Sequence, residues 1–61
     1  MITIAPEIQR RIAEAAITWR IEEKLYDVYQ ANGNYLAART QRRVVAEARK
    51  EFDAAVEAAQ Q

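Results

Sequence analysis

The sequence predicts an all-α fold, in which 61 residues form an antiparallel two-helix hairpin. Three observations support this prediction. The only glycine, Gly33, lies near the middle of the chain between two asparagines. The flanking halves contain no other strong helix breaker apart from one early proline, and in both halves apolar residues recur at spacings of three and four. The halves are also nearly equal in length, so we expect them to form one domain spanning residues 1–61.

The first helix is expected over about residues 5–31. Pro6 fits the first helical turn, where its missing N–H is not needed. Either Thr3 or Ala5 then precedes the helix as its N-cap residue. One side of this helix is apolar with a single polar interruption, Glu22, and we expect this side to face the second helix. Its apolar members are Ile8, Ile12, Ala15, Trp19, Tyr26 and Tyr29.

The turn is expected at residues 32–34. Glycine readily adopts the left-handed conformation with which helices commonly end, and Asn34 can cap the next helix through its side-chain oxygen. The second helix is then expected over about residues 35–60, and helix-favouring residues fill most of it. Its inward-facing side comprises Ala38, Gln41, Val45, Ala48, Phe52, Ala55 and Ala59.

An antiparallel hairpin determines which residues face each other. Because both helices rise equally per residue, the numbers of opposed residues should sum to about 67. Trp19 is therefore expected opposite Ala48, and Ala15 opposite Phe52, so that a large side chain meets a small one at each level.

Glu22 is polar although it lies within the inward-facing side, and Gln41 is its approximate counterpart on the second helix. We interpret the pair as a polar layer that sets the register, in which Gln41 or Arg42 satisfies the Glu22 carboxylate. The alternative interpretation assigns this carboxylate to a functional site.

The first helix has a second apolar side, roughly opposite the first at about 100° of rotation per residue. One neighbouring helix cannot cover both sides, and contiguous exposed apolar patches generally mark interaction sites. Either two hairpins pair as a homodimer that forms a four-helix bundle, or the patch docks on a different protein. We favour self-association, because so small a domain is only marginally stable alone. The residues are Ile17, Ile21, Leu25 and Val28.

Tyrosines gather near the expected turn, and basic residues share about a third of the circumference of the second helix. The tyrosines either close the end of the hairpin, which we favour, or anchor a partner. The basic residues are either a solvated face with ordinary ion pairs, which we favour, or contacts to nucleic-acid phosphates. The two sets are Tyr26, Tyr29 and Tyr35, and Arg39, Arg42, Arg43, Arg49 and Lys50.

The composition disfavours catalysis, and we expect no enzyme activity and no cofactor. The chain lacks cysteine, histidine and serine, which removes the commonest nucleophiles, the usual general base and the histidines of helical di-iron sites. A net charge of zero supplies no general attraction to nucleic acid or anionic membranes. No apolar stretch approaches the roughly 18 residues of a membrane-spanning helix, and the N-terminus does not resemble a secretory signal.

We therefore expect a small cytoplasmic protein of the kind that bacteria and phages encode. Its expected function is to bind another protein as an inhibitor or adaptor, while associating with itself and not with membranes. A nucleic-acid-binding regulator and a purely structural assembly subunit are the alternatives.

Overall fold

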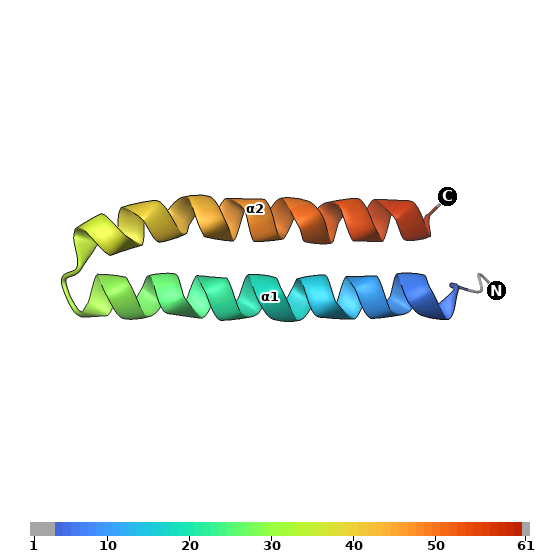
Figure 1. The fold of residues 1–61 in the computed structure, drawn as a ribbon, viewed down its shortest axis with the longest axis horizontal. Helices are drawn as coiled ribbons and strands as arrows, with labels where there is room; N and C mark the ends of the chain where they lie inside the picture. The colour runs from blue at the N-terminus through green and yellow to red at the C-terminus, as the bar shows by residue number, and fades with distance from the viewer. Residues whose placement is uncertain (1–3, 61) are drawn as a thin grey trace.

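The computed structural model describes residues 4–60, which form two antiparallel helices joined by a tight turn (Figure 1). Helix α1 spans Pro6–Ala31 and helix α2 spans Tyr35–Ala59. The helices lie side by side, and the molecule extends 47 Å along its long axis and only 15 and 13 Å across it. The predicted all-α hairpin is confirmed.

The N-terminal end of α1 is capped by main-chain groups. Ala5 has φ −58° and ψ 143°, an extended conformation that a following proline favours, so the helix begins at Pro6. The Ala5 carbonyl accepts hydrogen bonds from the N–H groups of Ile8 and Gln9, both at 3.0 Å. Among residues 4–60 no side chain caps this end, and Thr3, the other candidate cap, lies outside these described residues.

The turn has the predicted chemistry. Gly33 has φ 73°, and its N–H donates to the Gln30 carbonyl at 3.1 Å, while the Asn34 N–H donates to the Tyr29 carbonyl at 2.9 Å. This pair of bonds is the Schellman arrangement, which satisfies carbonyls at the end of a helix. The Asn34 side-chain oxygen then accepts from the Ala37 N–H at 3.3 Å and caps α2. The predicted roles of Gly33 and Asn34 are confirmed.

Small residues occupy the centre of the contact between the helices. Ala38, Ala48 and Ala55 are the buried apolar residues of α2, and no large side chain in residues 4–60 is fully buried. All the predicted inward-facing residues of α1 are half-buried, as are Val45 and Phe52 on α2. The alanines allow the helices to approach closely, and larger side chains cover the contact from its edges.

The two largest aromatic residues pack against each other. The ring centroids of Trp19 and Phe52 are 5.4 Å apart, and the ring planes are tilted by 39°. Helical side chains lean toward the N-terminus of their own helix, so in an antiparallel pair these two rings lean toward one another. The expected levels paired Trp19 with Ala48 and Phe52 with Ala15, and the contact between the two rings was not expected.

Gln41 ties the two helices together in the middle of the hairpin. Its Nε2 donates to the main-chain carbonyl of Glu22 at 2.9 Å, and only 7% of Gln41 is exposed. The expectation that Gln41 would bind the Glu22 carboxylate was wrong, because Gln41 binds the main-chain carbonyl of Glu22 instead. A carbonyl oxygen has two lone pairs, so it can accept this bond in addition to its helical hydrogen bond. The residue numbers of the hydrogen-bonded pair, Glu22 and Gln41, sum to 63, and those of the aromatic pair, Trp19 and Phe52, sum to 71. These sums lie on either side of the value of about 67 expected for an antiparallel hairpin.

Candidate protein-interaction site

The second apolar side of α1 is open to solvent. The exposed fractions are 58% for Ile17, 59% for Ile21, 37% for Leu25 and 45% for Val28. At about 100° per residue these side chains lie on the part of α1 turned away from α2. We call these four residues the α1 stripe.

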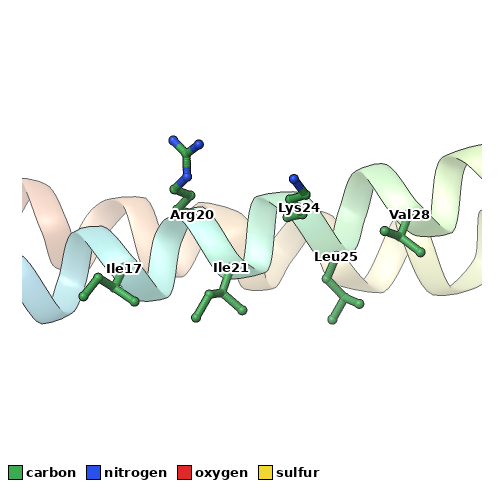
Figure 2. Close-up of a pocket in the computed structure, with 6 residues that line it drawn as sticks. All are labelled: Ile17, Arg20, Ile21, Lys24, Leu25 and Val28. Atoms are coloured by element: carbon green, nitrogen blue, oxygen red, sulfur yellow. The ribbon is translucent and has the colours of Figure 1, made fainter.

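A shallow hollow of about 400 Å³ runs along the α1 stripe (Figure 2). Figure 2 shows Ile17, Ile21 and Leu25 projecting from one edge of α1, and Arg20 and Lys24 from the other edge. An apolar centre with charged groups confined to the rim is the usual composition of a protein–protein contact. The residues that line the hollow are Ile17, Arg20, Ile21, Lys24, Leu25 and Val28.

Two further large aliphatic residues, both on α2, are exposed and were missed by the sequence analysis. Leu36 is 79% exposed and Val44 is 37% exposed. The sequence does contain a signal for Val44. Because it is adjacent to Val45, a rotation of about 100° separates the two side chains, and only one of them can face α1 squarely.

The structure separates the three candidate tyrosines. Tyr26 and Tyr29 are half-buried on the side of α1 that faces α2. The Tyr26 hydroxyl accepts a hydrogen bond from Gln30 Nε2 at 2.7 Å. Tyr35 is 68% exposed at the start of α2. Of the three, Tyr35 offers the largest fraction of its surface to a partner.

The candidate basic residues of α2 are all exposed, but they do not point to one place. Arg39 and Arg43 line a hollow of about 240 Å³ on α2. Arg42 instead lines a groove of about 370 Å³ between the helices, together with Glu23 and Asp27. Arg42 therefore shares this groove with two acidic residues of α1.

Arg49 is directed toward α1. Its guanidinium carbon lies 5.9 Å from the centre of the Trp19 ring, within the range of a cation–π interaction. Of the five basic residues, Arg42 and Arg49 thus lie on the side of α2 toward α1. The other three, which are Arg39, Arg43 and Lys50, remain on the outer face of α2.

Comparisons with known proteins supply no relative: no family model, curated protein or solved structure matches the chain. Neither helix, over the described residues 4–60, combines the length and apolar character needed to cross a lipid bilayer. The same residues contain no cluster of three or more histidine, cysteine or acidic side chains placed to hold a metal ion. Function is therefore inferred from the surfaces of the hairpin itself.

Proposed function

We propose that this protein is a small, non-enzymatic protein-binding regulator, of the inhibitor or adaptor type, that acts as a self-associating helical hairpin. The observation that carries the proposal is the α1 stripe, whose four aliphatic side chains are 37–59% exposed. A contiguous apolar surface of this kind generally marks a site of association.

The surface area supports self-association. The chain exposes 5214 Å², whereas a compact monomer of 7.0 kDa is expected to expose about 4,000 Å². The excess of roughly 1,200 Å² exceeds the roughly 800 Å² that each partner contributes to an interface of standard size. In the proposed assembly, two hairpins pack α1 against α1 and form a four-helix bundle that covers both stripes.

The first turn of α2 provides a second surface, which is proposed to bind the regulated protein. Tyr35 and Leu36 are adjacent in sequence, and both are largely exposed. Tyrosine is enriched among the residues that dominate binding energy, because it supplies a large, rigid contact area. This end of α2 is distinct from the α1 stripe, so self-association and partner binding are compatible.

Replacing Tyr35 by alanine is expected to weaken partner capture at least about tenfold, since truncating a tyrosine anchor typically costs about 1–2 kcal/mol or more. The immobilised protein is exposed to a lysate of the source organism, with and without nuclease, and the captured proteins are quantified by mass spectrometry. Thr40→Ala, also at an exposed position of α2, serves as the control. Capture that persists in Tyr35→Ala, or that disappears after nuclease treatment, would argue against this surface and this partner class.

The alternative function, nucleic-acid binding through the basic residues of α2, can be tested separately. Changing Arg39, Arg42 and Arg43 to glutamine is expected to alter stability by no more than about 1 kcal/mol per residue, because exposed ion pairs contribute little. We expect the native chain to show no RNA or DNA binding tighter than about 10 μM at physiological salt, which is weaker than specific complexes. Fluorescence anisotropy across a salt series checks both expectations. Binding that falls steeply with salt and is lost in the triple variant would establish the alternative.

A further inference from the structure

The hollow along the α1 stripe has the spacing of a helix-packing surface. Its six lining residues form two overlapping sets, each at positions i, i+3, i+4 and i+7. Four residues at this spacing make the hole that receives one side chain of a facing helix. The surface is therefore shaped for two successive side chains of another α-helix. The sets are Ile17, Arg20, Ile21 and Lys24, and Ile21, Lys24, Leu25 and Val28.

We infer that the helix received by these holes is α1 of a second copy, running antiparallel about a two-fold axis beside residues 22 and 23. The inference rests on the self-association proposed above. The centres of the two holes are four residues apart, as are Ile21 and Leu25. In this arrangement Leu25 of the second copy enters the first hole and Ile21 of the second copy enters the second. The same symmetry brings Ile17 beside Val28 of the second copy.

The charges beside the stripe favour the antiparallel orientation. Glu14 continues the line of the stripe one turn before Ile17, so a parallel pair would bring the Glu14 carboxylates of both copies together. The antiparallel pair instead places Glu14 near residues 31 and 32 of the second copy, which are uncharged.

Val44, the half-exposed valine of α2, lies on one flank of this arrangement. Leu25 follows Glu22 by three residues, and Val44 follows Gln41, the hydrogen-bonding partner of Glu22, by three residues. Each step rotates the side chain by about 60° in the same sense around its own helix. Because the helices are antiparallel, both rotations turn toward the same face of the hairpin. Val44 therefore lies on the same face of the hairpin as Leu25, at about the level of the two-fold axis.

Single cysteines test the orientation directly, because the native chain contains none. Ile17→Cys and Val28→Cys variants are mixed, allowed to exchange and oxidised in a glutathione buffer. The mixed disulfide, which joins position 17 of one copy to position 28 of the other, is expected to exceed either symmetric disulfide at least about tenfold. Only this mixed pair falls within the Cα separation of roughly 4.4–6.8 Å that disulfides require. Ala46→Cys, exposed on the outer side of α2, is the control and should not cross-link.

A spin label provides a second readout that leaves the interface intact. Gln60→Cys is exposed at the C-terminal end of α2. The antiparallel pair separates its two labels by about 45 Å or more, whereas a parallel pair brings them within about 25 Å. Double electron–electron resonance measures this distance.

The outcomes distinguish this inference from the proposed self-association. The mixed disulfide together with the long label distance supports the antiparallel pair. Symmetric disulfides, or a short label distance, in a chain that sediments as a dimer would overturn the orientation but preserve self-association. A dimer without any of these disulfides would show that another face is used. A monomeric native chain would overturn both.

Discussion

Replacing Phe52 by alanine is expected to lower the free energy of unfolding by about 3 kcal/mol. This value lies at the lower end of the range for phenylalanine truncation, because Phe52 is half-buried. The loss is large for this chain, since 61 residues are expected to provide only roughly 3–9 kcal/mol of total stability. The substitution removes the ring that packs at 5.4 Å against Trp19 and uncovers the alanine-lined contact between the helices. The cooperative unfolding transition should therefore nearly disappear.

Circular dichroism during urea and thermal unfolding measures this effect. Phe52→Leu is the matched control and is expected to cost less than about 1.5 kcal/mol, because it keeps most of the apolar volume. Trp19 fluorescence adds a local probe, because Trp19 is the only tryptophan and contacts Phe52. If Phe52→Ala unfolds like the native chain, the aromatic contact does not stabilise the hairpin and the register deduced from it is wrong.

Replacing Ile21 by glutamate is expected to weaken self-association at least about a hundredfold, since burying an unpaired carboxylate costs several kcal/mol. In a single hairpin Ile21 is 59% exposed, so the substitution should cost the isolated fold little. A large loss in the free energy of unfolding would therefore come from the assembly, in which a second copy covers Ile21, and not from the single hairpin. Size-exclusion chromatography with light scattering, over a concentration series, gives the dissociation constant.

Ala46→Glu is the matched control for Ile21→Glu. Ala46 is exposed on α2, at about the same level as Ile21 along the hairpin but facing away from the stripe. This variant should associate like the native chain. Equal association of Ile21→Glu and the native chain would show that the α1 stripe lies outside the interface.

The hairpin could be predicted from the sequence because its determinants are local and periodic. A glycine flanked by asparagines determines the turn, and the spacing of apolar residues determines which side of each helix faces inward. The contact between Trp19 and Phe52 was missed because opposed positions alone do not describe the direction in which side chains lean. The Glu22 carbonyl was missed as a partner of Gln41 because sequence patterns emphasise side chains, whereas the main chain also accepts hydrogen bonds.

The candidate site was only partly predictable. The α1 stripe follows from periodicity, and the structure shows its four residues exposed. The paired holes could not be predicted from that periodicity alone, because they depend on where Arg20 and Lys24 project beside the aliphatic side chains. Val44 was missed because its face is defined only once the antiparallel contact, through Gln41 and Glu22, is in place.

Sedimentation equilibrium of the native chain tests the central claim most directly. Over about 1–100 μM, where weak to moderate protein associations have their midpoints, we predict a folded helical species with twice the chain mass of 7.0 kDa, dissociating on dilution. A folded species of 7.0 kDa throughout this range would contradict self-association through the α1 stripe.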